Sequence, residues 1–313
     1  MTAGVTTFSC ESFTDLARVS GACEANGVEA RVLLRVNPAE APDARLAMSG
    51  VDSQFGFSET LLLQDEARAK VFLPRLRICG VHVYFGTQVA GVDALAANTR
   101  RALECAERVA RSLGFECVVV NAGGGFPWPF ASDAPAPDFT ALEATLGEVC
   151  DRSPLARVAA LWFESGRYIV AGSGTLVARV MDVKRLPTRT FVLLDTGIHH
   201  LSGMSGLGRV PRPGMSVRNL SRKPADAETI LADLAGPLCT PLDCVARSLS
   251  MPAVEEGDLV AIPNVGAYGL TASLTSFLSH PAPVEVAYGR GASPQAFQLR
   301  GGHAAFLQTD DSR

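Results

Sequence analysis

Residues 117–126 read Cys-Val-Val-Val-Asn-Ala-Gly-Gly-Gly-Phe, an apolar run followed by one polar residue, an alanine and three glycines. The run has the length and the β-branched content of a buried strand. Glycines directly after such a strand let backbone N–H groups approach an anion, because no Cβ stands in the way. A tight turn without a ligand would use the same residues, so the triplet alone leaves both interpretations open. It lacks the G-x-G-x-x-G spacing of a dinucleotide fingerprint, which argues against NAD binding.

Strands of the same kind alternate with helical stretches through the first half of the chain. The predicted strands are residues 5–9, 31–36, 78–84, 117–121 and 160–164. Helices are predicted over 11–26 and 92–113, since a glycine, Gly27 or Gly114, follows the last turn of each. The alternation indicates a parallel α/β fold. Polar residues at the strand ends are typical of a (β/α)8 barrel with its site at that edge.

The first half is too short for a whole barrel. A (β/α)8 barrel takes about 250 residues, or about 31 for each βα unit, so residues 1–170 hold about five units. We therefore expect a partial barrel in which strands 1–3 are missing. The strands at 117–121 and 160–164 then correspond to strands 7 and 8, where barrel enzymes often bind phosphate.

The second half of the chain has a different pattern, with short strands, turns and prolines. The predicted strands are residues 175–183, 191–195, 258–263, 284–288 and 296–299. This spacing indicates an antiparallel β domain, a sandwich or a small barrel, over residues 171–313. Residues 201–223, rich in Gly, Ser, Arg and Pro, are expected to form an exposed loop.

Composition narrows the class of protein. Of 313 residues, 47% are hydrophobic and 19% are charged, which allows a sizeable core. Lys plus Arg (28) nearly balance Asp plus Glu (32), so no nucleic-acid partner is expected. No apolar run reaches the ~18 residues of a membrane span, and a cytoplasmic protein without a membrane partner is predicted. The eight cysteines form no CxxC pair, so reduced thiols are expected.

Two motifs of the first half carry chemistry at predicted strand ends. Glu164-Ser-Gly-Arg167 closes a strand, and Gly166 with Arg167 beside the glycine triplet would form a phosphate site; a structural Arg–Glu ion pair is the alternative. Gly80-Val-His-Val-Tyr-Phe-Gly-Thr-Gln88 alternates, which points His82 and Tyr84 to one side. A tyrosine there can stack on a flat ring and the following threonine can bind an anion, whereas a lone strand histidine is more typical of a core.

Two motifs of the second half lie in loops. Gly236-Pro-Leu-Cys-Thr-Pro-Leu-Asp243 places Cys239 between two prolines, and Asn264-Val-Gly-Ala-Tyr-Gly269 frames Tyr268 with glycines. Each is weak evidence of a site when taken alone.

Taken together and in order, these motifs resemble those of the alanine-racemase-fold (type III) pyridoxal-phosphate decarboxylases, the diaminopimelate and ornithine decarboxylase family. Diaminopimelate decarboxylases have Gly-x-His-x-His-Ile-Gly-Ser-Gln at the position of 80–88 and Gly-Gly-Gly-Phe at 123–126. They have Glu-Pro-Gly-Arg at 164–167, Gly-Pro-x-Cys-Glu-Ser-Gly-Asp at 236–243 and Gly-Ala-Tyr-Gly at 266–269. The resemblance covers about residues 4–290.

The resemblance implies a pyridoxal 5'-phosphate cofactor and a homodimer with shared active sites. The residues that it assigns to the cofactor phosphate are Thr87, Gly123, Gly124, Gly125, Gly166, Arg167 and Tyr268. Glu164 would pair with the pyridine nitrogen and keep it protonated, and Tyr84 would cover the ring. Cys239 would reach into the neighbouring subunit's site and protonate the substrate carbon after CO₂ has left.

The departures from the family pattern bear on the substrate. The family's stacking histidine is replaced by Tyr84, and the glutamate after the loop cysteine by Thr240, so a free diamino diacid is less expected. These changes, with Asp-x-Gly-x-His-His at 195–200, are more similar to a branch found in natural-product and exopolysaccharide gene clusters. Some members of that branch act on aminoacyl groups bound to a carrier protein. An amino acid or a carrier-protein-bound aminoacyl group is therefore the predicted substrate.

The family's cofactor lysine lies at the end of barrel strand 1, and none of Lys70, Lys184 and Lys223 follows a predicted barrel strand. We expect either that the true start lies about 100 or more residues upstream, by the same length per unit, or that the chain is a remnant. The alternative function is thus a non-catalytic remnant or partner subunit that contributes Cys239 to a complete subunit's site. A racemase of the same fold would have no use for Cys239, which argues against that activity.

Overall fold

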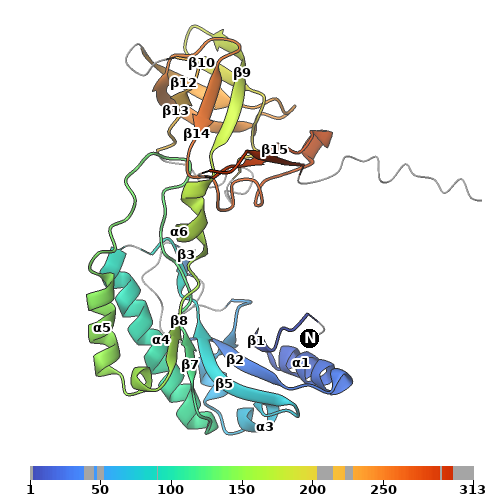
Figure 1. Cartoon of the computed structure of the whole chain (residues 1–313), viewed down its shortest axis with the longest axis vertical. Helices are drawn as coiled ribbons and strands as arrows, with labels where there is room; N and C mark the ends of the chain where they lie inside the picture. The colour runs from blue at the N-terminus through green and yellow to red at the C-terminus, as the bar shows by residue number, and fades with distance from the viewer. Residues whose placement is uncertain are drawn as a thin grey trace, which may run out of the picture. The chain divides into compact units, whose positions relative to one another are not determined.

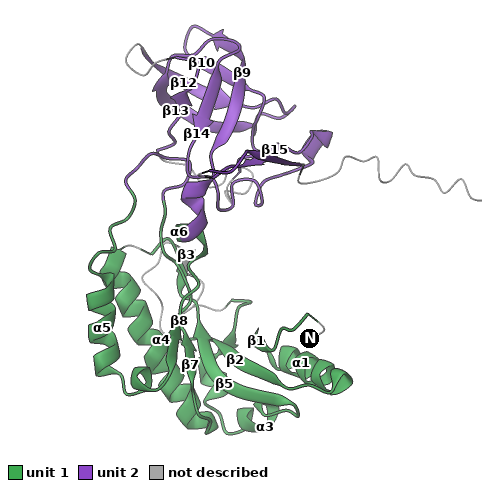
Figure 2. Cartoon of the chain, viewed as in Figure 1, with its two compact units in different colours: residues 1–128, 136–168 green, residues 129–135, 169–313 purple. Residues whose placement is uncertain are grey.

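The structure is a computed structural model that describes residues 3–38, 46–47, 53–89, 91–202, 214–222, 228–289 and 291–298. The chain forms two compact units, coloured separately in Figure 2. Unit 1 comprises residues 1–128 and 136–168, and unit 2 comprises residues 129–135 and 169–313. A short segment of the first half of the sequence, 129–135, therefore packs with the second unit.

Unit 1 is built on a parallel sheet (Figure 1). Its strands follow the order β1 (Thr7–Cys10), β2 (Ala30–Asn37), β5 (Leu76–Val83), β7 (Val119–Asn121) and β8 (Ala160–Trp162), and β4 (Phe57–Ser58) also pairs with β2. Every pairing in this sheet is parallel. The five strands predicted from the sequence are confirmed, with ends displaced by at most two residues.

Helices connect these strands. They are α1 (Phe13–Asn26), α2 (Glu59–Leu62), α3 (Ala67–Val71), α4 (Gly91–Leu113), α5 (Leu142–Arg152) and α6 (Gly166–Val170). Helix α1 begins where the Ser12 side chain accepts the Asp15 N–H, and it ends at Gly27, whose φ of 65° is left-handed. The two long predicted helices are confirmed, whereas α2, α3, α5 and α6 were not predicted. No helix in the described ranges is both long and apolar enough to cross a membrane.

The strands of unit 1 bury two faces. Leu34 of β2 and Val81 of β5 pack with helical residues such as Leu103 in the main core. Leu33, next to Leu34 in β2, and Val119 of β7 belong to a separate small cluster. Side chains of strands alternate in direction, so these two clusters mark opposite faces of the sheet. The result is the partial (β/α) barrel that the sequence predicts, with helices packed on one face.

Unit 2 contains a six-stranded sheet. Its order is β11 (Arg218–Asn219), β14 (Leu259–Ile262), β9 (Leu176–Arg185), β10 (Thr190–Leu194), β12 (Thr229–Ala235) and β13 (Cys244–Pro252). All neighbours are antiparallel except β10 and β12. Strands β15 (Val284–Ala287) and β16 (Gln295–Gln298) form a separate hairpin. The predicted antiparallel β domain is present, but β12, β13 and their parallel contact with β10 were not predicted.

The prediction of an exposed loop over 201–223 is wrong for part of that range. Met215 and Val217 are buried in the core of unit 2, and β11 joins the sheet directly afterwards. Apolar side chains two residues apart on an extended segment point to the same side, which is how this stretch contributes to the core. Residues 203–213 and Lys223 lie outside the described residues, as does Leu299 at the end of the last predicted strand.

All eight cysteines are free, and the expectation that they are core thiols holds for those that are buried. Five of them are buried, Cys150 and Cys244 are half-buried, and Cys239 alone of the eight is exposed. The cysteine that the motifs single out therefore differs from the others in its access to solvent.

Candidate functional site

The carboxyl-terminal edge of the unit 1 sheet gathers most of the predicted site residues. The loop after β7 carries the glycine triplet, in which Gly123 and Gly125 have φ values of 72° and 94°. A Cβ at Gly124 would lie 2.3 Å from the carbonyl oxygen of Glu164, and one at Gly125 would lie 2.5 Å from that of Gly86. No larger residue fits there, because backbone stands on both sides. The triplet thus lies between the segments that follow β5 and β8.

Tyr84 follows β5, and its ring lies against this loop. A Cβ at Gly123 would be 2.9 Å from Cδ2 of Tyr84. Thr87 ends the two-residue strand β6 (Gly86–Thr87), which pairs with β3 (Leu46–Ala47). The N–H of Val89 donates to the carbonyl of Gly125 at 2.9 Å, which holds this segment to the glycine loop.

The backbone of the glycine loop can accommodate an anion. The N–H of Gly123 donates to Oδ1 of Asn121 at 2.9 Å. Within the part of the chain that the structure describes, no hydrogen bond takes the N–H of Gly124 or Gly125. Unpaired amide groups in a glycine-rich turn are the donors that a phosphate group uses in proteins. By this test the loop fits a phosphate-bearing cofactor.

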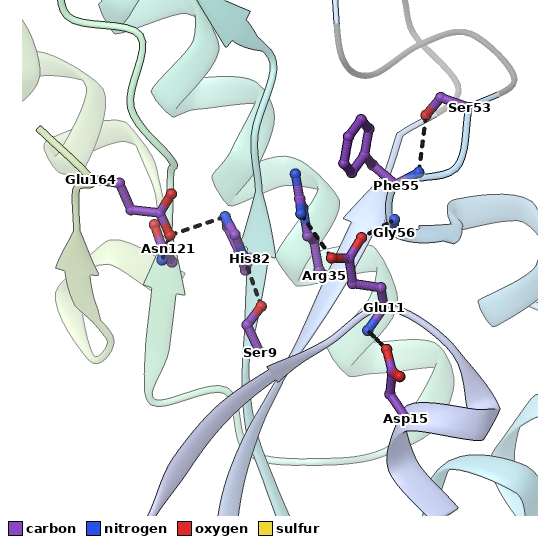
Figure 3. A network of polar contacts seen from close by, with 10 residues as sticks. All are labelled: Ser9, Glu11, Asp15, Arg35, Ser53, Phe55, Gly56, His82, Asn121 and Glu164. Carbon is purple, nitrogen blue, oxygen red and sulfur yellow. Dashed lines mark hydrogen bonds and ion pairs between the residues drawn. The ribbon is translucent and has the colours of Figure 1, made fainter. Parts of the chain in front are cut away.

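Glu164 is held in place by residues from the neighbouring strands (Figure 3). Its Oε1 accepts a hydrogen bond from Nδ2 of Asn121 at 2.9 Å. The same oxygen lies 3.4 Å from Nε2 of His82, an ion-pair distance without hydrogen-bond alignment. Nδ1 of His82 in turn lies 2.8 Å from Oγ of Ser9. The contacts connect β1, β5 and β7 with the residue that follows β8.

The surroundings of His82 fix where its proton lies. The imidazole is 5% exposed, and this burial lowers its pKa below the ordinary value of 6.5, while Glu164 opposes the shift. A neutral imidazole carries one N–H, and a carboxylate can only accept. The carboxylate of Glu164 at 3.4 Å favours the tautomer with the proton on Nε2, in which Nδ1 accepts from the hydroxyl of Ser9. As predicted, Val81 and Val83 pack in the core on the opposite side of the strand.

A second group of contacts adjoins this one in Figure 3. Glu11 follows β1, and its Oε1 lies 3.0 Å from the guanidinium of Arg35 in β2. Its Oε2 accepts the N–H of Gly56 at 3.0 Å, which anchors the segment before β4. Ser9, Glu11 and Arg35 were not predicted from the sequence as site residues. Their position at or just after predicted strands was the one available signal.

The remaining predicted residues are placed as follows. Gly166 begins α6, its N–H donates to the carbonyl of Glu164 at 3.1 Å, and Arg167 beside it is half-buried. Tyr268 and Cys239 belong to unit 2. Tyr268 is 44% exposed with φ of 62°, and Cys239 lies in the loop between β12 and β13. The roles assigned to all of these residues stay predictions.

Neither of the described lysines lies at the carboxyl edge of the unit 1 sheet. Lys70 lies in α3, with its ammonium 5.7 Å from the ring of Phe13, and Lys184 lies in β9 of unit 2. Lys223 falls outside the described residues. A lysine at this edge would have to come from elsewhere than the residues that the structure describes.

The sheet of unit 1 is parallel and of the barrel type, and its strand ends carry a glycine loop and the oriented carboxylate of Glu164. These features are typical of barrel proteins that bind a phosphate-bearing cofactor. The family model described as "Pyridoxal-dependent decarboxylase, pyridoxal binding domain" matches residues 1–171, more than half of the chain. The chain belongs to this family, the pyridoxal-phosphate-dependent decarboxylases related to diaminopimelate and ornithine decarboxylases. The resemblance seen in the sequence is thereby confirmed.

Individual relatives and solved structures of this family are similar to most of the chain. An L-glutamyl-[BtrI acyl-carrier protein] decarboxylase of Niallia circulans is 31% identical over 90% of this chain and 67% of its own length. A diaminopimelate decarboxylase of Zymomonas mobilis is 29% identical over 90% of this chain and 65% of its own. The crystal structure of diaminopimelate decarboxylase from M. jannaschii, 23% identical, superposes with a TM-score of 0.80 over 97% of this chain and 69% of its own. The fold prediction is confirmed, and the chain spans about two thirds of the length of these relatives.

We predict that His82 is neutral at pH 7 with its proton on Nε2. ¹⁵N NMR of the histidines should give a pKa below 6.5 for His82, because burial disfavours the charged form. Ser9→Ala should shift the Nδ1 resonance of His82 and leave that of His280, in unit 2, unchanged. A pKa above 6.5 would contradict the lowered pKa of His82. A proton on Nδ1 of the neutral ring would contradict the predicted tautomer.

Proposed function

We propose that the chain is the cofactor-binding and proton-donating part of a pyridoxal-phosphate-dependent decarboxylase. Its substrate would be an amino acid or an aminoacyl group on a carrier protein. The observation that carries the proposal is the carboxylate of Glu164, which accepts a hydrogen bond from Asn121 beside a glycine loop with two unpaired amide groups. Family membership supports the cofactor and the reaction class.

The glycine loop would bind the cofactor phosphate through the N–H groups of Gly124 and Gly125. The side chains proposed to complete this phosphate site are those of Thr87, Arg167 and Tyr268. Gly123 and Gly166, whose own N–H groups donate to Asn121 and to the carbonyl of Glu164, are proposed to leave room for the phosphate. Tyr84 would lie against one face of the ring, in the place of the family's stacking histidine.

Glu164 would accept the N–H of the pyridine ring. Both contacts described for its carboxylate, from Asn121 and from His82, are made to Oε1, so Oε2 is the oxygen left for the cofactor. When bound, pyridoxal phosphate supplies an electron-accepting ring that stabilises the negative charge left as CO₂ departs. The contribution of this chain is to keep the carboxylate oriented, so that the ring nitrogen retains its proton.

Cys239 would donate the proton that replaces CO₂. Its thiol is exposed in a loop of unit 2, where a partner molecule can approach it. We propose a homodimer in which this loop completes the site of the neighbouring subunit. The proposed substrate class is supported by Thr240, which replaces the family's glutamate, and by the relative at 31% identity whose name gives a carrier-bound glutamyl group as its substrate.

A second candidate function rests on the positions of Lys70 and Lys184, neither of which lies at the sheet edge. In it, the chain is a non-catalytic partner subunit that contributes Cys239 to a complete subunit. A mass-spectrometric screen for CO₂ loss from free and carrier-bound amino acids, with the full-length gene product, separates the two. Turnover by that product alone supports the decarboxylase, whereas turnover that requires a second protein supports the partner subunit.

We predict that Gly124→Ala weakens binding of pyridoxal phosphate at least tenfold. The new Cβ would lie 2.3 Å from the carbonyl of Glu164, so the loop has to move and its amide groups move with it. Equilibrium dialysis of the full chain measures the effect. Gly147→Ala is the matched control, because a Cβ at Gly147 meets nothing within 4 Å. Equal affinity of the two variants would contradict the phosphate site.

We predict that Cys239→Ala in the full-length decarboxylase binds the cofactor normally but loses turnover by about 10²–10⁴-fold, the usual contribution of a general acid. Mixing it with a Glu164→Ala chain should restore part of the activity, because one of the two shared sites is then intact. If heterodimers form and the mixture stays as inactive as either parent, the shared site is disproved.

A further inference from the structure

The loop that carries Cys239 is attached to the sheet of unit 2 by a buried carboxylate. Asp243 is 4% exposed. Its Oδ2 accepts the N–H of Leu238 at 2.7 Å, within the same loop, and its Oδ1 accepts the N–H of Ile198 at 2.8 Å. Ile198 belongs to the turn after β10. One side chain therefore joins two segments that are far apart in the sequence.

Two glycines make room for this carboxylate. A Cβ at Gly197 would lie 2.1 Å from Oδ1 of Asp243, and a Cβ at Gly236 would lie 2.3 Å from Oδ2. Neither position can take a larger residue unless the carboxylate moves. The carboxylate of Asp243 thus requires a glycine at both positions. Gly197 belongs to the Asp-x-Gly motif and Gly236 to the Gly-Pro-x-Cys motif.

Backbone hydrogen bonds close the loop on itself. The N–H of Gly236 donates to the carbonyl of Asp243 at 3.0 Å, and that of Asp243 donates to the carbonyl of Thr240 at 3.1 Å. The N–H of Thr240 donates to the carbonyl of Leu238 at 2.8 Å. Leu238 is buried while the neighbouring Cys239 is exposed. The position of the thiol is therefore set by the closed loop and by the carboxylate that holds it.

We propose that Asp243 is the positioning residue of Cys239, and that it fixes the thiol by clamping the loop 236–243 to the turn after β10. This proposal rests on the proposed function of Cys239 as the proton donor. Asp243 itself does not touch the reacting atoms. It acts through two backbone N–H groups, since a carboxylate is acceptor-only and can satisfy both at once.

Asp243→Asn tests the clamp, because an amide offers one acceptor oxygen and turns an N–H₂ group toward the other backbone N–H. Asp233→Asn is the matched control. Asp233 is also 4% exposed, lies in β12, and accepts the N–H of Ser248 at 2.7 Å and the guanidinium of Arg189 at 3.1 Å. The substitution Asp233→Asn therefore removes a buried carboxylate from the same sheet but leaves the contacts of loop 236–243 with Asp243 in place.

The first measurement is hydrogen exchange in the full chain. Asp243→Asn should accelerate exchange of the Ile198 and Leu238 amides at least tenfold, and Asp233→Asn should leave both unchanged. If these amides remain protected in Asp243→Asn, the clamp is disproved, whatever the activity. This outcome does not depend on the role of Cys239.

The second measurement is turnover of the full-length decarboxylase in a double-mutant cycle. Asp243→Asn should lower kcat at least tenfold with cofactor affinity unchanged, and it should cause no further loss in a Cys239→Ala background. An equal loss in both backgrounds would show a general structural role and overturn the proposal. If Cys239→Ala itself retains full turnover, the proposed function fails while the exchange result stands. Should Asp243→Asn not fold, Asp243→Glu, which keeps the charge but lengthens the side chain, is expected to give the same non-additivity.

Discussion

The carboxylate of Glu164 can serve a cofactor only if the strands that hold it keep their register. His82 pairs with Asn121, and Asn121 pairs with Trp162, two residues before Glu164. A slip of one residue would turn the imidazole and the amide to the opposite face of the sheet. The register shift between β2 and β5 also decides which way His82 points. Ile78 and Val81 both pack in the main core although they are three positions apart, because β5 has one extra residue between them. The extra residue in β5 therefore turns His82 toward Glu164.

The two units use glycines for the same physical purpose. Gly124 lets the loop after β7 pass the backbone of Glu164, and Gly197 and Gly236 let two loops close around Asp243. In each case a Cβ would collide with an acceptor oxygen or with the chain that carries it. Close approach of the segments that carry Glu164 and Asp243 thus explains why these positions are glycine. The proposed anion site would be an additional use of the same geometry in unit 1.

The sequence predicted the local structure better than the distant contacts. The strands of unit 1 were found because β-branched runs alternate with helices that end at Gly27 and Gly114. Strand β12 was missed because the buried Asp233 interrupts its apolar pattern, and its parallel pairing with β10 depends on folding rather than on local pattern. The glycine triplet, Tyr84 and Glu164 were recognisable as strand-end residues. The link from Ser9 to His82 was not, because it joins residues 73 positions apart.

The role proposed for Glu164 is to keep the cofactor's ring nitrogen protonated. The most direct measurement is the ¹⁵N chemical shift of pyridoxal phosphate labelled in the pyridine ring and bound to the full chain at pH 8. We expect the shift of a protonated nitrogen in the native chain and of an unprotonated one in Glu164→Gln, since an amide does not hold the proton as a carboxylate does. An unprotonated nitrogen in the native chain, or no binding of the cofactor, would contradict this role.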